Sequence, residues 1–161
     1  MDVFRRILDK LLITGTILSG VSMIIVVIIQ VIARFSLPTA PPWTEEAARI
    51  SFIFMVSFAA GLAVRDNAYI NVDTFINLLP QKIRQIVNLV IHLFIVFLMA
   101  IIFIQSIHLV KIGSMQQSPS LHIPMSYIFF SICILSFFLG LYLFMEAYTN
   151  FKEIKNSGNE K

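Results

Sequence analysis

The polar residues with the most distinctive spacing form the segment Trp43-Thr44-Glu45-Glu46-Ala47-Ala48-Arg49. If this segment is helical, Glu45 lies four residues and Glu46 three residues before Arg49, so either carboxylate can pair with the guanidinium group. The acidic residues come first, which suits the positive end of the helix dipole. Trp43 is typical of a membrane–water interface. We therefore expect an ion-paired start of a helix at a membrane surface.

Two interpretations of this cluster are open. The cluster could form an ion pair between helices or between subunits, with Arg34 as a further basic residue. It could instead be a self-paired helix start in which the long arginine side chain reaches the membrane surface. The cluster by itself favours the second, structural interpretation.

Other residues that could support chemistry lack the required arrangement. His92 and His108 fall on one expected helix and His122 in a loop, whereas haem bound between membrane helices needs a histidine on each of two facing helices. Cys133 is the only cysteine and cannot form an internal disulfide or a cysteine-rich metal site. Phosphate-binding loops, zinc-protease motifs and nucleophile elbows are not present in the sequence. We expect no cofactor, no metal and no enzymatic activity.

The composition indicates a membrane protein. The chain has 161 residues, of which 58% are hydrophobic and 13% are charged. Soluble domains have about 45–50% apolar and about 25% charged residues, and a short chain cannot bury such an excess. The net charge is +3, and the charged residues lie almost entirely between the apolar runs. It therefore indicates topology rather than binding to nucleic acid.

Four apolar segments are long enough to cross a bilayer, which takes about 20 helical residues. They cover about residues 11–33, 43–64, 85–110 and 123–145. The first is too long for the apolar region of a signal peptide, which has about 7–15 residues. Between the second and third, Val72, Phe75, Ile76 and Leu79 share one helical face, which predicts a short interfacial helix at about 71–79; an irregular loop is the alternative. We expect an all-α integral membrane fold in a single domain over residues 1–161.

The distribution of basic residues predicts the orientation. Nine of the twelve lysines and arginines fall in the N-terminal segment, the loop at 65–84 and the C-terminal tail. With four spans these three regions lie on one side, and the positive-inside rule places that side in the cytoplasm. Both termini are therefore expected to be cytoplasmic, and the loops at 38–44 and 113–122 periplasmic.

Small residues are spaced for close helix packing. Ser57 and Gly61, and likewise Ser136 and Gly140, are four residues apart, a spacing that lets helices approach closely in lipid. No acidic residue, lysine or arginine occupies the middle of an expected span, and proline occurs only at the start of the fourth. Internal transport sites usually contain such residues. These patterns favour a protein that packs against another membrane protein.

The arrangement Arg34…Trp43-Thr44-Glu45-Glu46-x-x-Arg49, then Gly61-x-x-x-Arg65, then Ile70-Asn71-Val72-Asp73, resembles the small membrane subunit of tripartite ATP-independent periplasmic (TRAP) transporters, the DctQ-like or Q subunit. The resemblance covers the whole chain in size, span number and orientation. Family members often have histidine where this chain has Tyr69, which weakens any role for that position.

The resemblance implies a multi-pass protein of the bacterial inner membrane, surrounded by membrane lipids. It implies pairing with a large membrane subunit that holds the sodium and substrate sites. It also implies a periplasmic binding protein that delivers an organic acid such as a C4-dicarboxylate or sialic acid, and the separate, unfused chain most resembles subunits of sialic-acid systems. The small subunit would be the scaffold of an elevator-type carrier. Residues expected at interfaces or in structural ion pairs are Arg34, Trp43, Glu45, Glu46, Arg49, Arg65 and Asp73.

Two other function classes are compatible with four spans. A self-contained homo-oligomeric four-helix carrier or channel would need an ionisable residue at membrane depth, and Glu45, Glu46 and Arg49 are the available ones. A cofactor-bearing anchor of a redox enzyme would show haem absorbance when purified. We expect part of the periplasmic loops to contact the binding protein.

Overall fold

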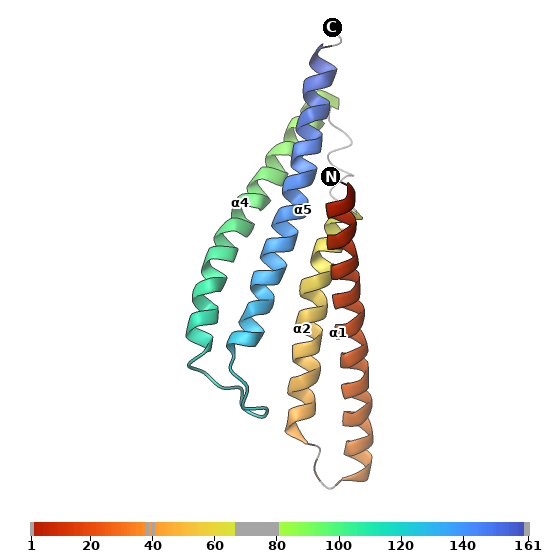
Figure 1. Ribbon diagram of the computed structural model, residues 1–161, viewed down its shortest axis with the longest axis vertical. Coiled ribbons are helices and arrows are strands. Elements are labelled where there is room, and N and C mark those ends of the chain that lie inside the picture. Colours follow the sequence, from red (N-terminus) through yellow and green to blue (C-terminus); the bar gives the residue numbers. More distant parts are fainter. Residues whose placement is uncertain (1, 38, 40, 67–80, 160–161) are drawn as a thin grey trace.

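The fold is a set of long helices. The computed structural model describes residues 2–37, 39, 41–66 and 81–159. Within these ranges the helices are α1 (Asp2–Ser36), α2 (Pro42–Arg65), α4 (Gln81–Gly113) and α5 (Ser126–Asn159), as Figure 1 shows. All four are long and apolar enough to span a membrane, over Arg5–Ser36, Pro42–Arg65, Val87–Gly113 and Ser126–Tyr148. This confirms the expected all-α membrane fold. The interfacial helix expected at 71–79, and Asp73 within it, lie outside the described residues.

Prolines define the start of α2. Pro41 has an extended backbone (φ −65°, ψ 124°), and Pro42 occupies the first turn of the helix, where a missing N–H is not needed. The hydroxyl of Thr44 donates a hydrogen bond of 2.7 Å to the carbonyl of Pro41. The helix therefore begins in a fixed position, with Glu45, Glu46 and Arg49 in its first two turns.

The helices form a single row in the order α1–α2–α5–α4. Helix α1 packs along α2, α2 packs along α5, and α5 packs along α4. Helix α4 makes no extensive contact with the described parts of α1 or α2. Figure 1 shows the helices side by side, with α4 at one edge of the row and α1 at the other. It differs from a four-helix bundle, in which the helices surround a common core.

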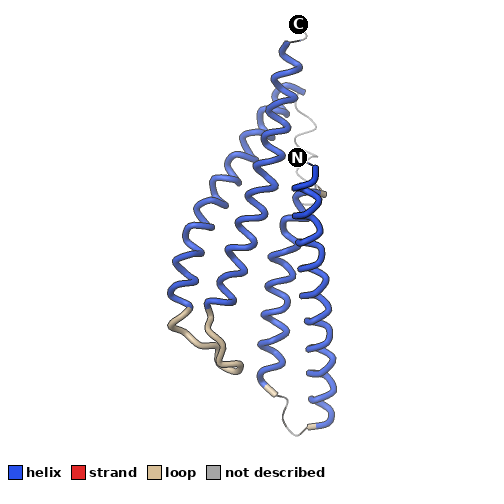
Figure 2. Tube along the Cα trace, viewed as in Figure 1, coloured by secondary structure: helices blue, strands red, loops and turns tan. Residues whose placement is uncertain are grey.

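The two ends of the row differ. The start of α1 and the end of α5 lie at one end, which we name the terminal end. The end of α1, the start of α2 and the loop at 114–125 lie at the other, which we name the loop end (Figure 2). This arrangement follows from an even number of spans.

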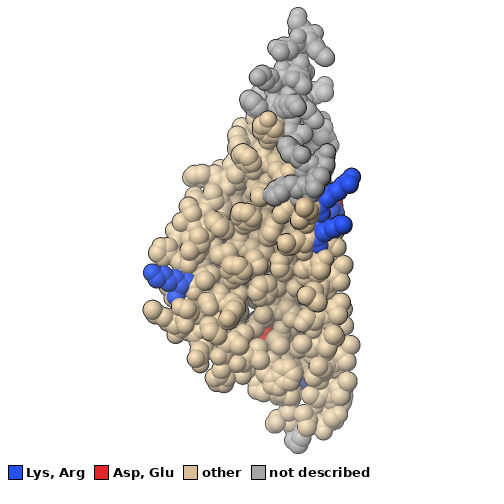
Figure 3. All heavy atoms as spheres, viewed as in Figure 1, with Lys and Arg blue, Asp and Glu red and all other residues tan. Residues whose placement is uncertain are grey.

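Most large apolar side chains point away from the row. A small buried core of Leu12, Val64, Tyr142 and Leu143 joins α1, α2 and α5 near the terminal end. Long stretches of α1 and α4 are exposed, including Ile17, Ile24, Val90, Phe94 and Ile104. On the face in Figure 3, basic side chains form two separate patches and the remaining described surface is almost entirely uncharged. A surface of this kind is stable when lipid or another protein covers it.

The four small residues predicted to pack helices lie at or near helix contacts. Ser57 and Ser136 are buried, and each hydroxyl donates to a carbonyl four residues back, that of Ile53 or Ile132. A Cβ at Gly61 would lie 2.9 Å from Leu12 Cδ1 of α1 and 3.3 Å from Phe138 Cβ of α5. A Cβ at Gly140 would lie 3.2 Å from Met99 Cβ of α4. Gly61 thus stands where three helices meet.

Candidate functional site

The predicted ion pair at the start of α2 is present on the surface. Arg49 Nη2 donates to Glu45 Oε1 at 3.0 Å, four residues apart on the helix. About two thirds of each side chain is exposed (66% and 69%). An exposed pair of this type contributes about 0.3–0.5 kcal/mol to stability. Its main effect is therefore to hold the guanidinium group in a defined position.

Glu46 has a different partner from the one that its spacing suggested. Its Oε2 accepts hydrogen bonds from the backbone N–H groups of Ser120 and Leu121, at 2.9 and 3.1 Å. Of the two carboxylates spaced to pair with Arg49, the structure pairs Glu45 and directs Glu46 to the loop. The physical reason is that two backbone donors of the 114–125 loop, which would otherwise be unsatisfied, converge on the carboxylate. Glu46 therefore ties α2 to the α4–α5 connection.

The 114–125 loop is folded so that these donors face α2. The N–H of Ser118 bonds to the carbonyl of Ile123 at 2.9 Å, and that of Met125 to the carbonyl of Gln116 at 2.9 Å. His122 takes a positive φ of 55°, which turns the chain back towards α5. The loop is thus a compact turn with its own hydrogen bonds.

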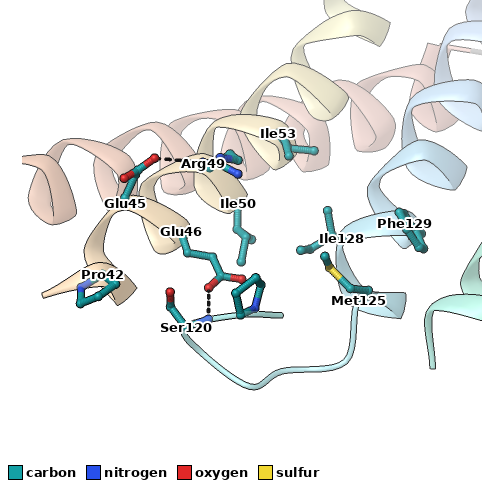
Figure 4. A pocket seen from close by; sticks show the side chains of 11 residues that line it. Pro42, Glu45, Glu46, Arg49, Ile50, Ile53, Ser120, Met125, Ile128 and Phe129 are labelled. Atoms are coloured by element: carbon teal, nitrogen blue, oxygen red, sulfur yellow. Dashed lines mark hydrogen bonds and ion pairs between the residues drawn. The ribbon is translucent and has the colours of Figure 1, made fainter. Parts of the chain in front are cut away.

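A groove of about 410 Å³ lies beside this contact, between α2, the loop and the start of α5. Figure 4 shows Glu46 pointing from α2 to the loop, and Ile50 and Ile128 facing one another across the space. The complete lining is Pro42, Glu45, Glu46, Arg49, Ile50, Ile53, Pro119, Ser120, Met125, Ile128 and Phe129. The charged residues lie at its loop-end side and the apolar residues further along the helices.

A second polar cluster joins three helices near the terminal end. Arg65 of α2 binds Asp66 through Nε at 2.7 Å and Nη2 at 3.0 Å, and lies 3.5 Å from Asp9 of α1. The hydroxyl of Tyr142 on α5 donates to the same Asp9 carboxylate. The neighbouring Arg65 guanidinium lowers the pKa of Asp66 below its ordinary value. We name Asp9, Arg65, Asp66 and Tyr142 the terminal-end cluster.

One helical turn beyond Tyr142, a further contact connects α5 to α4. Glu146 Oε2 lies 3.7 Å from Nε2 of His92, and Nδ1 of His92 lies 2.6 Å from the carbonyl oxygen of Asn88. His92 is buried, so the ring is held between the two helices. The terminal-end cluster connects α1 to α2 and to α5, and this contact connects α5 to α4, so polar contacts link α1, α2, α5 and α4.

The remaining predicted residues are less involved. Arg34 is exposed at the end of α1, and no ion pair with it occurs within the described ranges. It is therefore not brought to the Glu45–Arg49 pair. Trp43 is 41% exposed at the start of α2. Asp9 and Tyr142 were missed from the sequence, although an aspartate among basic residues and a tyrosine four residues before Glu146 are signals of a polar helix face.

These polar residues make contacts near both ends of α2. Glu46 and Arg65 are about 28 Å apart along α2 at ~1.5 Å per residue, close to the ~30 Å thickness of a hydrocarbon core. Residues 50–64 between these positions carry no charge. Among the described residues, no group of three or more histidine, cysteine, aspartate or glutamate side chains is placed to hold a metal ion. The charged groups of α2 thus lie a membrane thickness apart, and at both places they make contacts to other parts of the chain.

Comparisons with known proteins agree with this architecture. Residues 23–153 match the family model described as the DctQ component of tripartite ATP-independent periplasmic transporters. A protein of Haemophilus influenzae named as a TRAP transporter small permease protein is 29% identical over 155 residues, which cover 96% of this chain and 92% of that protein.

Two further relatives carry a substrate in their names. The sialic acid TRAP transporter small permease protein SiaQ of Vibrio cholerae is 27% identical over 63% of this chain and 57% of its own length. The sialic acid TRAP transporter permease protein SiaT of Haemophilus influenzae is 30% identical over 49% of this chain, but the match covers only 13% of that longer protein.

Proposed function

Because the chain belongs to the DctQ family, the small membrane component of TRAP transporters, we propose that it is the scaffold subunit of a sodium-coupled importer of organic acids. In this role it does not bind the solute. It packs against a large membrane subunit that holds the sodium and substrate sites, and a periplasmic protein delivers the solute. The names of the SiaQ and SiaT relatives support sialic acid as the first solute to test, with C4-dicarboxylates second.

The observation that carries the proposal is the single row of helices without charge between its two polar ends. A row has two broad apolar faces, whereas a carrier that encloses a polar solute needs a polar path at membrane depth. The charged side chains described here are used at the ends of the helices for contacts within the chain. The apolar faces remain available to a second membrane protein.

The proposed orientation places the loop end in the periplasm. It is supported by the excess of lysine and arginine near the termini. In intact cells, a membrane-impermeant maleimide should label Gln117→Cys in the exposed loop and should not label Lys10→Cys near the N-terminus. Labelling of Lys10→Cys alone would reverse the orientation.

The test of the function is reconstitution. The tagged chain should co-purify with a large membrane subunit. Liposomes that contain both subunits should take up sialic acid when the binding protein and an inward sodium gradient are supplied. The expected result is loss of uptake when this chain is omitted. Full uptake by the large subunit alone would refute the scaffold role, and solute flux through this chain alone would favour a self-contained homo-oligomeric carrier.

A further inference from the structure

The groove at the loop end combines two environments that few sites in a membrane protein share. On one side lie Glu45, Glu46 and Arg49, two carboxylates and one guanidinium group, of which Glu45 and Arg49 pair with each other. On the other side the groove continues between apolar side chains, chiefly Ile50, Ile53 and Ile128. Its volume of about 410 Å³ is within the ~300–1,000 Å³ range of sites that hold small molecules. An occupant must therefore be charged at one end and apolar at the other.

The depth of the groove matches the boundary between headgroups and acyl chains. Trp43, a residue type that prefers this boundary, lies one helical turn before Glu46. From Pro42 to Ile53 the lining extends about 16 Å along α2 at ~1.5 Å per residue. The charged side of the groove thus lies at headgroup level, and its apolar side reaches into the hydrocarbon.

The charged groups have hydrogen-bonding capacity left for an occupant. A guanidinium group has five N–H donors, and Arg49 uses one of them on Glu45. The two backbone N–H groups of the loop both bind Oε2 of Glu46, and a carboxylate has two oxygens with about four lone-pair sites, so Glu46 can accept further hydrogen bonds. Residues three apart on a helix have Cβ atoms about 5–6 Å from each other. The groove therefore presents a donor for an anion and an acceptor for a cation at its loop-end side.

We propose that this groove binds one molecule of phosphatidylethanolamine. The phosphate accepts hydrogen bonds from Arg49, the primary ammonium group donates to Glu46, and the beginning of an acyl chain lies along Ile50, Ile53 and Ile128. A zwitterionic headgroup supplies both charges within one small unit. This site is independent of the transported solute, and it stands or fails separately from the scaffold function.

The pattern of hydrogen bonds predicts selectivity among lipids. Phosphatidylcholine carries the same charges, but its quaternary ammonium has no N–H to donate to Glu46. Phosphatidylglycerol lacks the cation, so its phosphate reaches Arg49 without a partner for the carboxylate. We expect the protein to retain phosphatidylethanolamine most strongly and to retain the other two lipids clearly less.

The test is native mass spectrometry of the purified, delipidated chain in detergent, titrated with each of the three lipids bearing identical acyl chains. Arg49→Gln should reduce retention of phosphatidylethanolamine about tenfold, the effect of losing one charge-assisted hydrogen bond. Arg49→Lys should keep most of it. Arg34→Gln, which changes an exposed arginine at the same end of the row, should leave retention unchanged.

A second pair of variants tests the apolar part. Ile53→Trp should fill the groove and reduce retention without changing a charge, whereas Ile32→Trp on the exposed face of α1 should not. Equal elution and melting of all variants establishes that they are folded. Equal retention of the three lipids, or equal effects of Arg49→Gln and Arg34→Gln, would overturn the proposal. So would crosslinks in the purified complex that place a side chain of the large subunit in the groove.

Discussion

The contact between Tyr142 and Asp9 offers a direct test of how the row is held together. Replacing Tyr142 by phenylalanine removes one hydroxyl group and keeps the aromatic ring that packs in the buried core of α1, α2 and α5. Asp9 then loses the donor from α5 and retains the Arg65 guanidinium at 3.5 Å. The substitution thus isolates one interhelical hydrogen bond.

The expected loss of stability follows from the surroundings of the two groups. A hydrogen bond to a charged group contributes about 1.5–3 kcal/mol when buried. Tyr142 is 2% exposed, but the side chain of Asp9 is 20% exposed and can recover part of its solvation. We therefore expect Tyr142→Phe to lower the free energy of unfolding by about 1.5–2 kcal/mol, the lower part of that range.

The assay is unfolding of the purified protein in mixed micelles, followed by circular dichroism. The matched control is Tyr148→Phe, on the same helix, because Tyr148 is 57% exposed and its ring lies outside the core. The control should change the free energy of unfolding by less than about 0.5 kcal/mol. If the two variants lose the same stability, or neither loses any, the terminal-end cluster does not fasten α5 to α1.

Three other substitutions have defined outcomes. Gly61→Ala should lower the free energy of unfolding by about 1–2 kcal/mol, because the added Cβ would lie too close to side chains of two neighbouring helices. The control Gly20→Ala should be neutral or stabilising, because its Cβ meets only a flexible methionine sulfur at 3.2 Å. Equal melting temperatures of the two variants would contradict this. Glu46→Ala should speed hydrogen exchange of the two loop amides that it binds about tenfold, and Glu45→Ala should not. Because its arginine neighbour lowers the pKa of Asp66, that ion pair contributes stability at neutral pH and loses it as the pH falls through the lowered pKa. In pH-dependent unfolding, wild type and Asp66→Asn should therefore differ at pH 7 and converge in acid; a difference that persists in acid would refute the ion pair.

The number and type of helices could be predicted from the sequence because apolar length alone determines them. Three uncharged runs, residues 11–33, 85–110 and 123–145, exceed the ~20 residues that cross a hydrocarbon core. The second span reaches this length only when Glu45, Glu46 and Arg49 are included with residues 50–64. The Glu45–Arg49 pair was predicted for a similar reason, since a spacing of four residues on one helix places the side chains together. Local geometry was sufficient in both cases.

Contacts between distant segments could not be predicted in this way. Glu46, like Glu45, is spaced along the helix so that it could reach Arg49. It instead binds backbone amides more than seventy residues away, because the fold of the 114–125 loop places these amides beside it. Likewise, Asp9 and Tyr142 meet only because α1 and α5 both border α2 near the terminal end. Spacing along one helix has no information on which other helix lies beside it.

The order of the helices in the row has a consequence for how the protein is made. Helices α1 and α2 leave the ribosome before α4 and can pair at once, but the extensive contacts of α4 are with α5, which is synthesised after it. During biogenesis α4 therefore waits in the bilayer without its neighbour. Helix α5 then enters between α2 and α4 and joins the α1–α2 pair to α4. A ribosome that stops before α5 would therefore leave the α1–α2 pair and α4 unconnected by these contacts.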